Sequence, residues 1–90
     1  MTDQVKAQVI IYSSSLCGFC FRAKRLLDSK GAAYQEISVD GRNDLRQQMM
    51  QSTGGRTVPQ IIINGNAIGG CDELHMLDRQ QKLDSLLAVS

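Results

Sequence analysis

Short apolar runs alternate along the chain with longer stretches in which apolar residues recur at helical spacing. Residues 9–12 are β-branched and aromatic, which predicts a buried first strand. The period then changes to that of a helix, whose inward stripe is Leu16, Phe19, Cys20, Ala23, Leu26 and Leu27. Gly31 is suited to end this helix, residues 34–39 alternate as a second strand does, and Asp40-Gly41 marks a turn.

A second helix is predicted after that turn. Asn43 or Asp44 is suited to cap its N-terminus, and the glycine pair Gly54-Gly55 is suited to end it. The apolar side of this helix consists of Leu45, Met49 and Met50. The chain therefore places a helix between the second strand and the apolar segment that begins at residue 60.

The last third of the chain predicts a hairpin followed by two helices. Residues 60–64 form a third strand, and the Asn-Gly-Asn sequence at 64–66 is a tight turn into a short fourth strand at 67–69. A helix then runs from Asp72 to about residue 80, and a last short helix follows it. The inward residues of these two helices are Leu74, Leu77, Leu83, Leu86 and Leu87.

This order of elements predicts an α/β fold. A right-handed βαβ unit followed by an antiparallel hairpin gives a mixed four-stranded sheet flanked by helices. A length of 90 residues suffices for one domain with one modest core, so we expect a single domain over residues 1–90.

Composition excludes several classes of function. With 42% apolar residues, 21% charged residues and a formal net charge of +1, the chain lacks the basic excess typical of nucleic-acid or membrane-surface binding. Its longest apolar runs are too short to span a bilayer. The first eight residues lack the apolar core of a secretory signal, so we expect a cytoplasmic protein.

The cysteines give the first indication of chemistry. Three cysteines do not make a disulfide framework, and in a cytoplasmic chain their spacing favours redox or metal chemistry. Cys17 falls where the first helix begins, and the unpaired N–H groups of a first helical turn stabilise a thiolate. Cys20 lies on the same side of that turn but within the apolar stripe. We therefore expect Cys17 to be the nucleophile and Cys20 a buried resolving thiol with a higher pKa.

Zinc is an alternative for the same residues. Cys17, Cys20, Cys71 and His75 formally complete a ligand set. About fifty residues with two strands and a helix separate the two half-sites, however, unlike the compact arrangement of zinc ribbons and fingers. We therefore expect no metal ligands.

Further short motifs follow the cysteine pair along the chain. They are Arg22-Ala23-Lys24, Val39-Asp40-Gly41, Arg56-Thr57-Val58-Pro59-Gln60 and Gly69-Gly70-Cys71-Asp72. With these motifs the chain resembles the short bacterial dithiol glutaredoxins from residue 9 to about 87. The resemblance implies a thioredoxin-like fold and a monomeric, glutathione-dependent thiol–disulfide oxidoreductase. Such an enzyme reduces protein disulfides and glutathionylated proteins, and it is linked to glutathione reductase through glutathione.

The resemblance also implies a glutathione site. It implies a cis Pro59, which leaves the Val58 backbone to pair with the cysteinyl part of glutathione. The N–H groups of Cys71 and Asp72 are expected to take the γ-glutamyl carboxylate, and the Asp72 side chain its ammonium. Arg46, with Arg56 second, is expected to take the glycine carboxylate. The expected contacts are Phe19, Arg46, Thr57, Val58, Pro59, Gly70, Cys71 and Asp72. Each has a plainer alternative: Asp72 as a helix cap, the arginines as surface charges, and Cys71 as an inert residue or a third redox thiol.

Two features depart from the dithiol pattern. Gly18 and Phe19 stand where the family usually has proline and tyrosine, and Ser14 where a lysine is common. Glycine loosens the first helical turn, so the redox potential is expected to differ from that of the typical member. Cys-Gly-Phe also resembles the monothiol glutaredoxins, which hold a [2Fe–2S] cluster with glutathione as a second ligand. The alternative function is therefore a glutathione-ligated cluster homodimer bound through Cys17.

Overall fold

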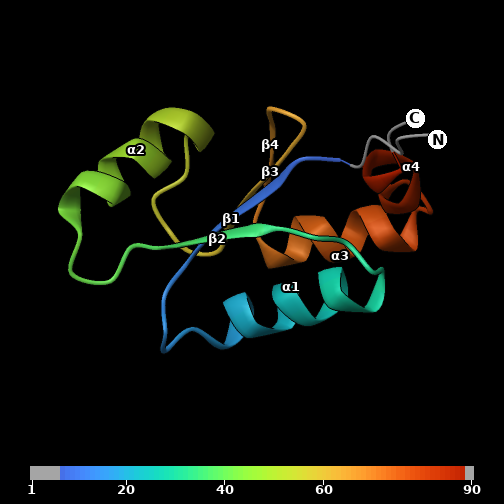
Figure 1. Cartoon of the computed structure of the whole chain (residues 1–90), viewed down its shortest axis with the longest axis horizontal. Helices are drawn as coiled ribbons and strands as arrows, with labels where there is room; N and C mark the ends of the chain where they lie inside the picture. The colour runs from blue at the N-terminus through green and yellow to red at the C-terminus, as the bar shows by residue number, and fades with distance from the viewer. Residues whose placement is uncertain (1–6, 89–90) are drawn as a thin grey trace, which may run out of the picture.

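The computed structural model describes residues 7–88, and Figure 1 shows the arrangement of its elements. The strands are β1 (Val9–Ser13), β2 (Gln35–Ser38), β3 (Gln60–Ile63) and β4 (Asn66–Gly69). The helices are α1 (Gly18–Ser29), α2 (Asn43–Thr53), α3 (Cys71–Arg79) and α4 (Leu83–Leu87). One sheet has the order β2-β1-β3-β4, in which β1 and β2 are parallel and β3 is antiparallel to both of its neighbours. The predicted α/β fold with a mixed four-stranded sheet is confirmed.

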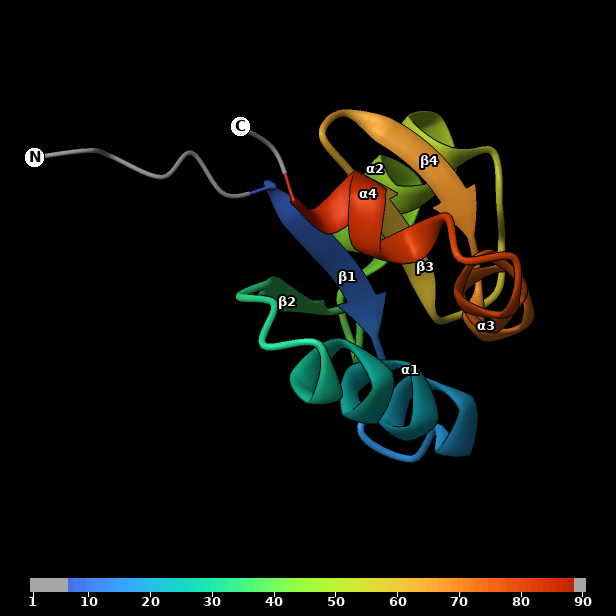
Figure 2. The ribbon, with the colours of Figure 1, turned by 90° about the vertical axis from the view of Figure 1, so that its right-hand side faces the viewer.

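Alternating side chains divide the core between the two faces of the sheet. Val9 and Ile11 pair with Ile63 and Ile61 and pack against α1, α3 and α4. The opposite face is smaller, and its buried residues are Tyr12, Val39, Met49 and Ile62. Figure 1 accordingly shows α1 and α3 on one side of the sheet and α2 on the other, and Figure 2 shows α4 beside the start of β1.

The predicted turn and helix ends are present. Asn64 and Gly65 adopt left-handed backbone angles, with φ of 52° and 81°, as a two-residue hairpin turn requires. Gly54 ends α2 with φ of 78°, and its N–H donates to the Met50 carbonyl. Within residues 7–88 no helix is long and apolar enough to cross a membrane.

The predicted start of α1 at Cys17 is confirmed, but the predicted apolar stripe was partly wrong. Leu16 lies outside the helix and is 97% exposed, and Phe19 is 55% exposed. The buried stripe begins only at Cys20 and continues through Ala23 and Leu27. The reason is that Cys17 occupies the N-cap position, so helical periodicity does not extend back to residue 16.

The predicted caps of two other helices were also wrong. The N-cap of α2 is Arg42 rather than Asn43 or Asp44, and its guanidinium donates to the Asp44 carboxylate at 2.9 and 3.0 Å. The N-cap of α3 is Gly70 rather than Asp72. The Glu73 carboxylate accepts a hydrogen bond from the Gly70 N–H at 2.8 Å, which satisfies this helix start and leaves Asp72 inside the first turn.

Candidate active site

Cys17 caps α1 with its own sulfur. Its backbone is extended, with φ of −112° and ψ of 108°, and its Sγ accepts a hydrogen bond from the Cys20 N–H at 3.1 Å. Sulfur in this position faces the unpaired N–H groups and the positive end of the helix. Cysteines that act as nucleophiles are commonly found at helix N-termini.

Cys20 has the opposite environment. It is 1% exposed, and burial together with a hydrogen bond to Cys17 raises the pKa of its thiol from 9.0 to about 12. The nearby charge of Lys24, which pairs with Glu36 at 2.9 Å, opposes that shift. Cys17 itself is half-buried, and both cysteines are free thiols. The predicted difference between an accessible and a shielded thiol is confirmed.

Asp40 holds the loop that carries Cys17. Its carboxylate accepts hydrogen bonds from the Ser14 hydroxyl at 2.6 Å and from the Ser15 N–H at 2.8 Å. These bonds, with a smaller contribution from the charge of Arg46, lower the pKa of Asp40 to about 2. These bonds thus fasten the loop between β1 and α1, which carries Cys17, to the turn after β2.

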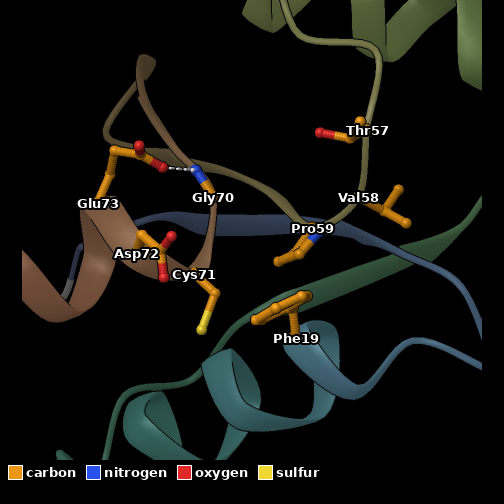
Figure 3. A pocket seen from close by; sticks show the side chains of 8 residues that line it. All are labelled: Phe19, Thr57, Val58, Pro59, Gly70, Cys71, Asp72 and Glu73. Atoms are coloured by element: carbon orange, nitrogen blue, oxygen red, sulfur yellow. Dashed lines mark hydrogen bonds between the residues drawn. The ribbon is translucent and has the colours of Figure 1, made fainter.

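A cavity of about 160 Å³ lies beside Cys17. Figure 3 shows its walls, which come from the first turn of α1, the segment before β3 and the first turn of α3. Its lining residues are Phe19, Thr57, Val58, Pro59, Gly70, Cys71, Asp72 and Glu73. The Cys17 thiol donates to the Val58 carbonyl at 3.6 Å, so the proposed nucleophile contacts one wall of this cavity.

Seven of the eight contact residues expected from the sequence therefore line one cavity, the exception being Arg46. The Val58–Pro59 peptide bond is cis, as expected. Arg46 lies on α2, where its charge helps to lower the pKa of Asp40. The exposed Arg56 does not line the cavity either. The assignment of a cation to the glycine carboxylate stays a prediction.

Close backbone approach shapes the cavity. A Cβ at Gly70 would lie 3.0 Å from the Pro59 carbonyl oxygen, so a larger residue there would push this segment away from the start of α3. On the other side, the Gln60 amide donates to the Thr57 carbonyl at 2.9 Å. A Cβ at Gly55 would lie 2.2 Å from that same amide nitrogen.

Three of these contributors were not predicted from the sequence. Glu73 lines the cavity and fastens the start of α3, while Gln60 and Gly55 support the segment before Val58. A glutamate three residues after Gly70 is the spacing of a capping box, and this signal was available in the sequence. The packing of Gly55 against Gln60 depends on a turn between them and has no local signal.

The third cysteine lies in the cavity wall. Cys71 is 4% exposed, and burial raises the pKa of its thiol. The Nδ1 atom of His75 is 3.4 Å from its sulfur and 2.9 Å from its carbonyl oxygen. Within residues 7–88, no three or more His, Cys, Asp or Glu side chains are grouped to hold a metal ion, so the four formal zinc ligands are not assembled.

The first turn of α3 presents polar groups to the cavity. The N–H groups of Cys71 and Asp72 lie in the first helical turn, where no intrahelical acceptor exists. The Asp72 carboxylate is exposed, and among residues 7–88 it takes part in no hydrogen bond or ion pair. The cavity thus combines helix N–H donors and one free carboxylate, and the Cys17 sulfur contacts its wall at Val58.

Comparison with known proteins gives consistent results. A family model described as Glutaredoxin matches residues 9–68. A glutaredoxin of Pseudomonas aeruginosa is 49% identical over 81 residues, which are 90% of this chain and 96% of that protein. Glutaredoxin 3 of Escherichia coli is 48% identical over 81 residues, covering 90% of this chain and 98% of its own.

Solved structures agree with the sequence comparisons. The crystal structure of a buckwheat glutaredoxin–glutathione complex superposes with a TM-score of 0.81 at 38% identity, covering 91% of this chain and 81% of that one. The fold is therefore thioredoxin-like. The chain belongs to the glutaredoxin family, whose members are thiol–disulfide oxidoreductases.

Proposed function

We propose that this protein is a glutathione-dependent oxidoreductase that reduces glutathionylated proteins and protein disulfides, with Cys17 as the nucleophile. One observation supports this above all: the Cys17 sulfur sits at a helix N-terminus and contacts Val58, in the wall of a cavity suited to a peptide. Cys20 is buried behind it with a raised pKa. Cys17 is placed to attack the substrate, and Cys20 is placed to resolve the disulfide that Cys17 then forms.

With a glutathionylated protein, the Cys17 thiolate attacks the glutathione sulfur. A Cys17–glutathione disulfide forms as the original disulfide breaks, and the protein thiolate leaves and takes a proton from water. A second glutathione, as thiolate, attacks the glutathione sulfur on Cys17. This releases glutathione disulfide and restores the Cys17 thiolate. Cys20 takes no part, and glutathione reductase recycles the product in any compartment that holds glutathione, such as the cytoplasm.

With a protein disulfide, Cys17 attacks one substrate sulfur and the other leaves as a thiolate. Cys20 then loses its proton and attacks the Cys17 sulfur, which frees the reduced protein and forms a Cys17–Cys20 disulfide. Two glutathione molecules reduce that disulfide and become glutathione disulfide. The raised pKa of Cys20 makes its deprotonation the demanding part of this sequence.

The cavity fits the groups of glutathione. Once Cys17 is part of a disulfide it no longer donates to the Val58 carbonyl, and among residues 7–88 the Val58 N–H has no acceptor. Both groups are then available to pair with the cysteinyl backbone, as an added strand does. The N–H groups of Cys71 and Asp72 would take the γ-glutamyl carboxylate, and the Asp72 carboxylate its ammonium. The resemblance to a glutaredoxin solved with glutathione supports this placement.

The remaining expected contacts surround these groups. Phe19 and Thr57 line the cavity on either side, and Gly70 allows the backbone to approach closely. We assign the glycine carboxylate to Arg46 or Arg56 by family resemblance. Substituting each in turn by glutamine would identify the cation, because loss of its ion pair raises KM for glutathione selectively.

The direct test is NADPH consumption in an assay coupled through glutathione and glutathione reductase, with glutathionyl-hydroxyethanethiol as substrate. We expect turnover by the wild type and by Cys20→Ser, and none by Cys17→Ser. A folded, reduced wild type without turnover would contradict the proposal. Visible absorbance of protein purified without oxygen, together with a dimeric mass, would then favour the [2Fe–2S] alternative.

A further inference from the structure

Exposed apolar side chains gather around the start of α1. Leu16 is 97% exposed and Phe21 is 60% exposed. Phe19, in the first turn of α1, is half-exposed and lines the cavity. Within residues 7–88 the only other exposed large apolar side chains are Met50 and Met76, on α2 and α3. Apolar side chains clustered on a surface beside a reactive group are typical of an interaction site.

Two free cations lie on the same surface. Arg22 lies over the Phe19 ring at 5.9 Å, and Arg25 lies over the Phe21 ring at 6.0 Å. Both arginines are exposed, and in the described part of the chain neither forms an ion pair, whereas Lys24 on the same helix is paired with Glu36.

The spacing of Phe21, Arg22 and Arg25 places them on one side of the helix. Positions 18, 21, 22 and 25 share the outward face of α1, opposite the buried stripe that begins at Cys20. We name Phe21, Arg22 and Arg25 the α1 face, and the exposed Leu16 lies in the loop before the helix. The first turn of α1 contains no acidic residue that would offset these charges.

We propose that the α1 face docks the protein part of the substrate, and that it favours a segment with apolar and acidic side chains beside the reacting cysteine. This inference rests on the proposed function. A disulfide bond of about 2.05 Å to Cys17 forces the surface next to that sulfur against the substrate. The cavity on the α3 side accommodates glutathione, and Phe21 and Arg25 do not line it. Phe21 and Arg25 are therefore available to contact the protein part of the substrate.

The chemistry of the α1 face indicates which partner fits. Arginine side chains pair with carboxylates through two parallel hydrogen bonds, and an aromatic ring beside them provides apolar contact area. A basic segment would meet like charge at Arg22 and Arg25. Because both arginines are exposed, the preference for acidic segments should act mainly on encounter and should weaken as salt increases.

The test compares two glutathionylated peptides with one small substrate. The peptides share a leucine next to the modified cysteine and differ only in carrying two glutamates or two lysines, and the small substrate is glutathionyl-hydroxyethanethiol. At low salt we expect wild-type kcat/KM to be about tenfold higher for the acidic peptide. Arg25→Glu should remove this preference, and Phe21→Ser should lower kcat/KM for both peptides. Both variants should keep turnover of the small substrate within about twofold of wild type.

Arg79→Glu is the matched control, because it makes the same charge change on an exposed arginine in the last turn of α3. Equal wild-type kcat/KM for the two peptides would overturn the inference, as would an equal effect of Arg79→Glu and Arg25→Glu. A dimeric wild type converted to a monomer by Phe21→Ser would overturn it too, by assigning the face to a second copy. A wild type that fails even on the small substrate would instead refute the proposed function.

Discussion

At the scale of single residues, the site depends on a contrast between two thiols three positions apart. Cys17 accepts a hydrogen bond from the first turn of α1, whereas Cys20 is buried under the same turn. One sulfur thus lies at the positive end of a helix, and burial disfavours the thiolate of the other. The sequence was sufficient to predict this contrast, because both effects follow from where the helix begins and which face is apolar.

Because of the buried Cys20 thiol, the stability of the reduced protein decreases at alkaline pH. The pKa of Cys20 is raised in the folded protein, so the folded state holds its proton more tightly than the unfolded chain does. This contribution is complete below pH 9.0 and is lost as pH rises toward about 12. We expect the free energy of unfolding of the reduced protein, measured with urea, to fall in this range by up to about 1.4 kcal/mol per pH unit. Cys20→Ala should show a shallower decline, and identical slopes would contradict the assignment.

Gly18 is suited to replacement by proline. It is the first residue of α1, and a Cβ there meets nothing within 4 Å. Proline is favoured at this helical position, and it reduces the freedom of the unfolded chain. We expect Gly18→Pro to raise the free energy of unfolding by about 0.4–1 kcal/mol in urea titrations. Gly54→Ala is the contrasting variant, because its φ of 78° makes alanine destabilising. A destabilised Gly18→Pro would show that the first turn has another geometry.

At the scale of elements, α2 depends on one anchor. Met49 is its only buried residue, and it packs with Tyr12, Val39 and Ile62 on the smaller face of the sheet. Deleting that side chain leaves a cavity that the sheet cannot fill. We expect Met49→Ala to lower the free energy of unfolding by about 2–5 kcal/mol in urea titrations. Met50→Ala, at the neighbouring exposed position, should change it by no more than about 0.5 kcal/mol. Equal effects of the two variants would contradict this packing.

Elements differ in how far the sequence predicts them. The buried strands and the Asn64-Gly65 turn were predicted because alternation and turn chemistry act over a few neighbouring residues. The caps of α2 and α3 were not, because several nearby polar residues compete for each helix start. The contact between Gly70 and the Pro59 carbonyl joins segments distant in the chain, so only the fold reveals it.

At the scale of the whole molecule, two helix N-termini meet at the cavity. The first turns of α1 and α3 both line it, and Figure 3 shows them on adjoining sides. Their positive ends favour an anionic peptide at this place. At the other end of α1, Lys30 pairs with Asp78 at 2.6 Å and with Asp84 at 2.9 Å, which connects α1 to α3 and α4. The packed helices therefore hold both N-termini in position.

The central claim is that glutathione becomes attached to Cys17. The most direct measurement is the mass of Cys20→Ser after brief treatment with glutathione disulfide, followed by peptide mapping. Without Cys20 to resolve it, the adduct should persist as one glutathione on Cys17, while the buried Cys71 stays unmodified. Cys17→Ser should gain no glutathione under the same conditions. Modification of Cys71 in place of Cys17, or no adduct on a folded and reduced protein, would contradict the account.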